Sequence, residues 1–258
     1  CLTLRIALVA DDISADWMRP ILGIPGVAVL GTPRVGGVCR GAFLGLNVGD
    51  HVGDSDHAVG ENRTRLARQL PMDSQMTWLK QVHGTHVIHA PTEYYPGVEA
   101  DAVWTDRAGY ACTIMSADCL PLVLADSDGR CVAAIHGGWR GLVAGIIRST
   151  IAALPADPGR LVAWLGPAIG PLAFEVGDDV LAAFSLSDDD EAVQSVSHLP
   201  GKYNLNLTTV AQRQLLACGV DAGHISGGDL CTFSDAQRFY SFRRDGKTGR
   251  MATLILVR

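Results

Sequence analysis

The chain has 258 residues, of which 48% are hydrophobic and 19% are charged, and its formal net charge is −6. This composition supports a sizeable hydrophobic core and excludes global disorder. The negative charge lacks the basic field needed to bind a nucleic acid polymer or a membrane surface. No apolar run approaches the roughly twenty residues of a membrane helix. We therefore expect one domain over residues 1–258, with neither nucleic acid nor membrane as a partner.

The cysteines indicate the cellular compartment. There are seven, an odd number, and no two of them form a CxxC pair. In a chain of this size such a set is typical of free thiols rather than of a disulfide framework. We therefore predict a cytoplasmic protein whose Cys112, Cys131 and Cys218 are small core residues.

The first part of the chain alternates short β-rich runs with glycine-rich turns. Residues 4–10 and 27–31 are predicted to be strands. A helix is predicted over residues 54–70, with Asp54 or Ser55 as its cap. Shorter strands are predicted at residues 76–79, 85–88 and 102–104.

The central third predicts buried strands at residues 112–115, 120–125 and 131–135, the last two joined by a turn at 126–129. A glycine-rich turn over residues 136–141 then leads into a predicted helix at 142–154, which Pro155 ends. A strand, glycine turn and helix in this order expose backbone N–H groups and the positive end of the helix dipole. We therefore expect this turn to hold phosphate or carboxylate beside His136.

The last third predicts a strand at residues 161–165 and helices at 178–184 and 208–218. The acidic stretch 188–191 between these helices is predicted to be a solvated loop. Residues 239–244 and 251–257 are predicted to pair as a hairpin around the turn at 245–249.

Three residues form a candidate metal site: His83, Cys119 and His136. Each lies next to a predicted chain reversal, where side chains can converge. Imidazole nitrogen and thiolate sulfur suit Zn²⁺, and three protein ligands leave one tetrahedral position for water or substrate. Spacing alone leaves open hydrogen-bonded histidines and a core cysteine, since distant ligands have no fixed interval. His86 and His89 are predicted not to be ligands, because strand side chains three residues apart point to opposite faces.

The motifs that are present and absent argue against several classes of enzyme. Eight scattered histidines do not easily build the multi-metal cluster of an oxygen-reducing copper oxidase. No GxxxxGK[ST] loop, no GxGxxG after a strand and no GxSxG elbow is present, so nucleotide hydrolysis, Rossmann cofactor binding and serine hydrolysis lose their usual support. If arginines near the glycine-rich turns line a cleft, their guanidinium forks suit an oxyanion such as phosphate. These arginines are Arg34, Arg140, Arg243 and Arg244.

Short motifs run in order along nearly the whole chain. They occupy residues 32–38, 46–54, 61–63, 81–84, 100–102, 117–121, 136–141, 165–170, 174–177 and 231–245. Together they resemble the laccase-domain or polyphenol oxidase-like family, which includes purine nucleoside phosphorylases and relatives of the bacterial peptidoglycan-editing factor. Pro33 and Cys39 stand where relatives often carry Thr and Ser, which affects the local turn rather than the metal site.

The resemblance implies a fold and a metal. The fold would be α+β, a single domain with two packed mixed β-sheets flanked by helices (α/β/β/α), like the catalytic domain of cytotoxic necrotizing factor. His83, Cys119 and His136 would be the catalytic residues and would hold zinc, with copper a less favoured alternative.

The resemblance also implies an activity. The chain would be a purine nucleoside phosphorylase acting on adenosine, inosine, guanosine and methylthioadenosine, with adenosine deaminase activity. Its partners would be a small-molecule nucleoside and phosphate, and we expect a monomer or homodimer. By motif position, the candidate substrate contacts are Asn47, Arg34, Arg140, Glu175 and Arg243.

Three alternatives remain open from the sequence. In a metal-free hydrolase, Cys119 would be the nucleophile and His136 or His83 the base, a chemistry suited to editing cell-wall (peptidoglycan) precursors. A copper-dependent polyphenol oxidase would take up oxygen. A non-enzymatic module would store metal or bind a partner.

Overall fold

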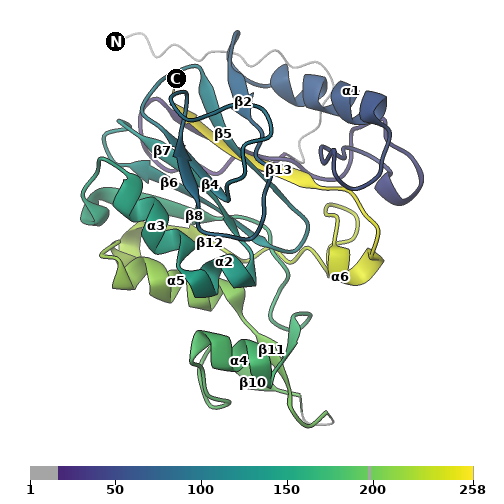
Figure 1. Cartoon of the computed structure of the whole chain (residues 1–258), viewed down its shortest axis with the longest axis vertical. Coiled ribbons are helices and arrows are strands. Elements are labelled where there is room, and N and C mark those ends of the chain that lie inside the picture. The colour runs from purple at the N-terminus through teal and green to yellow at the C-terminus, as the bar shows by residue number, and fades with distance from the viewer. Residues whose placement is uncertain (1–16, 197–198, 258) are drawn as a thin grey trace.

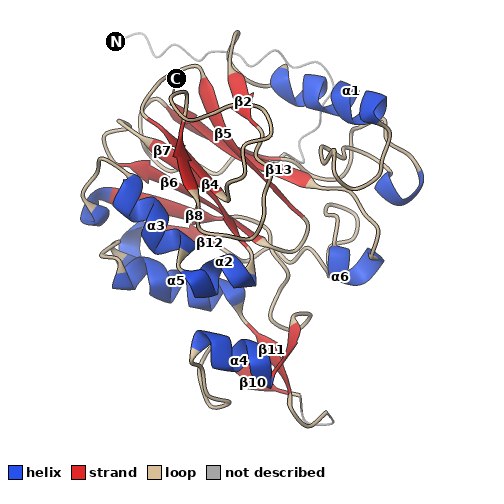
Figure 2. Ribbon diagram, viewed as in Figure 1, coloured by secondary structure: helices blue, strands red, loops and turns tan. Residues whose placement is uncertain are grey.

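The computed structural model describes residues 17–196 and 199–257 (Figure 1). The strand predicted at residues 4–10 lies outside the described residues. Two β-sheets pack against each other and helices cover their outer faces, as the colouring by secondary structure makes clear (Figure 2). The predicted α+β fold with two packed mixed sheets is confirmed.

The smaller of the two packed sheets has four strands, in the order β1–β13–β5–β2. Its strands are β1 (Val27–Gly31), β13 (Met251–Val257), β5 (Tyr110–Ser116) and β2 (Gln75–Thr77). β13 runs antiparallel to both β1 and β5, whereas β2 runs parallel to β5, so the sheet is mixed.

The larger sheet has six strands, in the order β12–β8–β6–β7–β4–β3. They are β12 (Ile225–Gly227), β8 (Leu161–Leu165), β6 (Leu120–Asp126), β7 (Val132–Gly137), β4 (Ala102–Thr105) and β3 (Val87–His89). The edge strands β12 and β3 are parallel to their neighbours and the central pairs are antiparallel.

Side chains alternate along the strands of the larger sheet, so each of its two faces packs into a different part of the hydrophobic core. In β6, Val123 and Ala125 face the other sheet, where they pack with Ile255 of β13. Leu122 and Leu124 point the opposite way, toward the helices. Every residue of β6 is buried, which explains its continuous apolar run, since a strand covered on both faces has no solvent side.

Helices complete the outer layers. α1 (Asp56–Ala67) covers the four-stranded sheet through Leu66, and its cap is Ser55, whose hydroxyl accepts from the Ala58 N–H. α3 (Ile146–Ala153) and α5 (Leu207–Ala217) cover the six-stranded sheet. Short 3-10 turns are η1 (Gly41–Phe43), η2 (Pro158–Arg160) and η3 (Ala222–His224).

A small third sheet projects from the body at the bottom of Figure 1. It contains β10 (Val193–Ser195), β11 (Lys202–Leu205) and β9 (Glu175–Gly177), next to α4 (Asp178–Phe184). The acidic stretch predicted to be a solvated loop precedes β10. Part of it is anchored, because Asp190 and Glu191 accept from the guanidinium of Arg213 on α5, at 2.6 and 3.1 Å.

Two predicted elements are wrong. The predicted helix 142–154 is two helices, α2 (Trp139–Ala144) and α3, because Gly145 adopts a left-handed φ of 94° that ends the first. The predicted hairpin 239–257 does not form. The Ser241 hydroxyl instead accepts from the Arg244 N–H and caps the short helix α6 (Phe242–Asp245). β13 finds its partners in β1 and β5, far away in sequence.

No helix in the described part of the chain is long and apolar enough to cross a membrane.

Candidate metal centre

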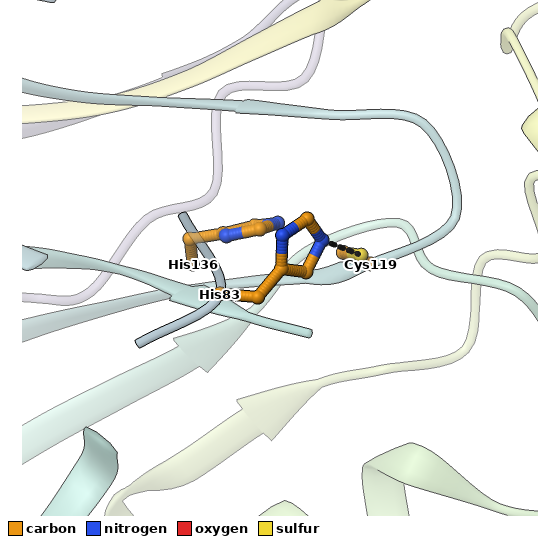
Figure 3. Close-up of side chains that lie close together, drawn as sticks. All are labelled: His83, Cys119 and His136. Carbon is orange, nitrogen blue, oxygen red and sulfur yellow. Dashed lines mark hydrogen bonds between the residues drawn. The ribbon is translucent and has the colours of Figure 1, made fainter. Parts of the chain in front are cut away.

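Three side chains from separate chain reversals point toward one another (Figure 3). His83 lies in the loop between β2 and β3, Cys119 in the bend between β5 and β6, and His136 near the end of β7. Their three candidate ligand atoms all lie within 4.8 Å of one another. Cys119 Sγ is 3.8 Å from His83 Nε2, and the two imidazole centroids are 4.7 Å apart. The convergence predicted from the chain reversals is therefore present.

The geometry fits a zinc ion. A tetrahedral ion with Zn–N near 2.05 Å and Zn–S near 2.3 Å separates nitrogen from sulfur by about 3.6 Å, close to the 3.8 Å between Cys119 and His83. His136 is buried, Cys119 is partly exposed and His83 is exposed. The group therefore closes toward the protein interior and opens on the His83 side, where water or substrate can approach.

The backbone turns sharply at two of these corners. His83 has a φ of 61°, and Asp118, immediately before Cys119, has a φ of 91°. Positive φ is uncommon for residues other than glycine, and such positions cluster at functional sites. In both cases a buried carboxylate holds the turn.

Asp101 is the first of these carboxylates. It accepts from the N–H groups of His83 at 2.9 Å and Gly84 at 2.7 Å, and it lies 2.8 Å from His136 Nδ1. A carboxylate on Nδ1 fixes the imidazole tautomer and leaves Nε2 as the ligand atom. Although burial acts to raise the pKa of Asp101, the bonds from His136 and the Gly84 N–H lower it below its ordinary value.

Asp118 is the second of the buried carboxylates that hold these turns. Its carboxylate accepts from the Thr232 hydroxyl at 2.6 Å, the Ser241 hydroxyl at 3.0 Å and the Arg243 N–H at 2.7 Å. These bonds tie the bend that carries Cys119 to residues more than 100 positions later in the chain. The C-terminal segment thereby supports the candidate metal centre.

Gln81 links the His83 loop to the end of β5. Its Nε2 donates to the Met115 carbonyl and its Oε1 accepts from the Met115 N–H, both at 2.8 Å. The side chain of Gln81 thus bonds to both the N–H and the carbonyl of Met115. This amide clamp, Gln81 on Met115, fixes the loop of His83 relative to the strand that leads to Cys119.

Cys119 and His136 form a charged pair in the metal-free protein. Burial acts to raise the pKa of Cys119, but attraction to and hydrogen bonding with His136 outweigh it and lower this pKa to about 6. Burial likewise acts to lower the pKa of His136, but the Cys119 thiolate and Asp101 raise it to about 9. A thiolate is the form of cysteine that binds metal or acts as a nucleophile.

The other two histidines of this region have different partners. His86 Nδ1 lies 2.7 Å from the Glu99 carbonyl. His89 Nε2 lies 3.0 Å from Asp106, and its ring stacks on Trp104 with centroids 3.9 Å apart. The group of three contains neither residue.

The structure places Asn47 in the protein interior. Asn47 is buried, and its amide bonds to Gly49, to Asp54 and to the Arg250 N–H. These bonds organise the loop at residues 47–54 and occupy the amide. Its predicted contact with substrate stays a prediction.

The predicted arginine and glutamate contacts have other bonding partners in the structure. Arg34 donates to the Ala236 carbonyl at 3.1 Å, and Arg140 stacks on Trp139 at 4.3 Å. Arg243 Nη1 donates to the carbonyl of Glu175 at 3.0 Å, so these two predicted contacts meet each other. Their contacts with substrate also stay predictions.

Sequence reasoning missed the residues that support the ligands. Asp101 and Gln81 lie inside recognised motifs, yet their partners His136 and Met115 are 35 and 34 residues away. No local pattern pairs residues over such distances. The buried carboxylate in the segment Ala100–Asp101–Ala102 was the available signal, because an acidic residue between apolar neighbours at the start of a strand requires an internal partner.

Two packed mixed sheets between helical layers, with one His–Cys–His group at the strand ends, define an α/β/β/α protein with a candidate metal centre. The chain belongs to the family described as multi-copper polyphenol oxidoreductase laccase, whose model matches residues 28–258.

Curated relatives and solved structures agree with this membership. Purine nucleoside phosphorylase PA4543 of Pseudomonas aeruginosa is 45% identical over 93% of this chain and 97% of its own length. Purine nucleoside phosphorylase YfiH of Escherichia coli is 41% identical over 93% and 96%. The crystal structure of Neisseria meningitidis protein NMB0706 superposes with a TM-score of 0.87 at 40% identity, over 94% of this chain and 99% of that one.

Proposed function

We propose that the chain is a zinc-dependent purine nucleoside phosphorylase with adenosine deaminase activity, acting on adenosine, inosine, guanosine and methylthioadenosine. The observation that carries the proposal is the approach of two imidazoles and one thiol to within 4.8 Å, open toward solvent at His83. The relatives named purine nucleoside phosphorylase, similar over almost their whole length, supply the reaction class.

The donor set favours zinc. Imidazole and thiolate in a tetrahedral arrangement suit Zn²⁺, whereas oxygen-reducing copper oxidases need several metals and many imidazoles. Residues 17–196 and 199–257 contain one group of three such ligands. That single group argues for a mononuclear centre despite the multi-copper wording of the family description.

The two reactions have different stoichiometries. Phosphorolysis converts adenosine and phosphate into adenine and ribose 1-phosphate, whereas deamination converts adenosine and water into inosine and ammonia. When bound, zinc supplies a Lewis acid that lowers the pKa of water toward neutrality. The protein residues orient this centre: Asp101 sets the tautomer of His136, and Gln81 and Asp118 fix the loops of His83 and Cys119.

We further infer a cytoplasmic enzyme, a monomer or homodimer, whose partners are a nucleoside and phosphate. Free thiols support the compartment, since the described cysteines, including the buried Cys39, Cys112 and Cys131, form no disulfide among themselves.

Product analysis tests the proposal. Zinc-loaded protein is incubated with adenosine, with and without phosphate, and the products are separated by chromatography. We expect adenine only when phosphate is present, and inosine in both conditions. The Cys119→Ala variant should give neither product. If the zinc-loaded protein yields no adenine with phosphate, phosphorolysis is excluded.

A metal-free Cys/His hydrolase is the second candidate, favoured by the lowered pKa of Cys119 beside His136. In it Cys119 attacks an acyl group of a peptidoglycan precursor, with a histidine as the base. Metal analysis and chelation separate the two candidates. Nucleoside turnover that survives removal of the metal would favour the hydrolase-type site.

A further inference from the structure

Arg250 lies beside the bend that carries Cys119, although the two residues are far apart in sequence. In the β13–β5 ladder Met251 pairs with Ser116. Arg250, one residue earlier, therefore lies next to the end of β5, where the chain continues through Asp118 to Cys119. The register of two central strands thus brings Arg250 next to the bend that carries Cys119, one of the candidate metal ligands.

The backbone and stem of Arg250 are firmly held. Its N–H donates to Asn47 Oδ1 at 2.8 Å, and its Nη1 donates to the carbonyls of Thr248 and Gly249 at 3.1 and 3.0 Å. Its aliphatic stem packs on Gly49, where an added Cβ would lie 2.7 Å from Arg250 Cγ. The guanidinium is thereby held in a fixed orientation.

The guanidinium of Arg250 is charged, and its nearest anionic neighbours act on it without forming an ion pair among the described residues. Within residues 17–196 and 199–257, no carboxylate forms an ion pair with it, whereas the nearby Arg63 pairs with Asp50 at 3.1 Å. Burial lowers the pKa of Arg250, and attraction to the Cys119 thiolate and the Asp118 carboxylate opposes this effect. A half-buried, preoriented cation without a carboxylate partner is suited to binding an anionic ligand.

We propose that Arg250 binds the oxyanion of inorganic phosphate beside the candidate metal centre, next to the bend that carries Cys119. The inference rests on the proposed phosphorylase function and adds a residue that presents phosphate to the nucleoside. A guanidinium offers phosphate a planar fork of N–H donors that can bind two of its oxygens at once, whereas the ammonium of lysine binds as a point charge. The centroid of the exposed Phe242 ring lies 6.0 Å from Arg250 Cζ.

The alternatives for binding phosphate are weaker. α2, which follows the glycine-rich turn, has only six residues, so its dipole cannot match that of the long helix predicted from the sequence. Arg140 is exposed and stacks on Trp139, and Arg243 donates to the Glu175 carbonyl. Of these cations, Arg250 is the one that directly precedes a strand whose pairing places it next to the bend that carries Cys119.

The test is calorimetric titration of inorganic phosphate into zinc-loaded full-length protein, with a kinetic measurement beside it. Arg250→Gln should raise the Kd and the KM for phosphate by about tenfold or more, and Arg250→Lys by a smaller factor. The KM for adenosine should stay unchanged. Arg238→Gln is the matched control, because Arg238 is a partly exposed arginine paired with Asp235 at 2.6 Å. It should bind phosphate like the wild type.

Zinc content and circular dichroism establish that each variant is folded and loaded. If Arg250→Gln fails either check, Gly49→Ala replaces it, because its new Cβ displaces the Arg250 stem while keeping the guanidinium. Unchanged phosphate Kd and KM in a folded, loaded variant would overturn the inference. If the phosphate Kd and KM are unchanged in such a variant and adenine is still formed, the phosphate site at Arg250 is excluded but the proposed phosphorylase function stands. If phosphate binds through Arg250 but no adenine forms, the phosphorylase proposal fails and the anion site remains.

Discussion

Asp101 and His136 form a buried carboxylate–imidazole pair, 2.8 Å apart, beneath the candidate metal centre. The same carboxylate also accepts from the backbone of the His83 loop. One acidic side chain therefore orients the candidate ligand His136 on β7 and the turn that presents the candidate ligand His83.

Asp101→Asn should weaken zinc binding by about 10- to 100-fold, the usual effect of removing an outer-shell partner. An amide can accept from His136 only by turning its NH₂ toward the N–H donors of the His83 loop. Zinc affinity is measured by competition with a chromophoric chelator.

Asp106→Asn is the matched control. Asp106 forms a similar pair with His89 at 3.0 Å, at a partly exposed position outside the ligand group. Its zinc affinity should equal that of the wild type. Equal losses in both variants would show that the effect is general destabilisation and not support of the metal ligand.

The thiolate of metal-free protein provides a prediction about pH. Because the pKa of Cys119 is lowered to about 6, its thiolate should be present above that pH and be lost as the pH falls through it. The measurement is the rate of iodoacetamide alkylation at Cys119 against pH, taking the difference from the Cys119→Ser variant. A midpoint close to the ordinary value of about 8.5 would contradict the charged pair with His136.

The convergence of His83, Cys119 and His136 could be predicted from the sequence because their residue types are chemically distinctive and each lies at a chain reversal. The layered fold followed from the resemblance, and the buried strands β6 and β7 from continuous apolar runs. Local patterns failed where the partner is remote. The turn chemistry at Asp245–Gly246 favours a hairpin, but a strand as apolar as β13 gains more by entering the centre of a sheet between β1 and β5.

The supporting residues were harder to predict for the same reason. Gln81 bonds to Met115, and Arg250 lies next to the bend that carries Cys119, only because strands far apart in the sequence pair in one register. Short strands such as β9 and β10, with three residues each, are also too brief to show an alternating pattern.

Gly138 is predicted to be intolerant of any side chain. A Cβ at this position would lie 2.7 Å from His83 Cδ2 and 3.3 Å from Cys119 Sγ. Gly138→Ala should therefore push His83 away and lower zinc affinity by about tenfold or more, as expected when a ligand loses its position. The bound metal per chain is measured after dialysis against a weak chelator.

Gly60→Ala is the control for this substitution. Gly60 lies within α1, and nothing approaches an added Cβ within 4 Å. This variant should keep its zinc and gain about 0.5–1 kcal/mol in free energy of unfolding, because alanine favours the helix. Full zinc binding by Gly138→Ala would show that the His83 loop can yield without losing the ion.

The clamp of Gln81 on Met115 gives a last prediction. In Gln81→Glu the carboxylate can accept from the Met115 N–H but repels the Met115 carbonyl, which loses its donor. An unsatisfied, partly buried carbonyl costs about 1–3 kcal/mol, so the midpoint of urea unfolding should fall and zinc affinity should fall with it. Gln75→Glu, at an exposed position on β2, is the control and should change neither quantity. If Gln81→Glu loses stability but binds zinc as tightly as the wild type, the clamp supports the fold without positioning His83.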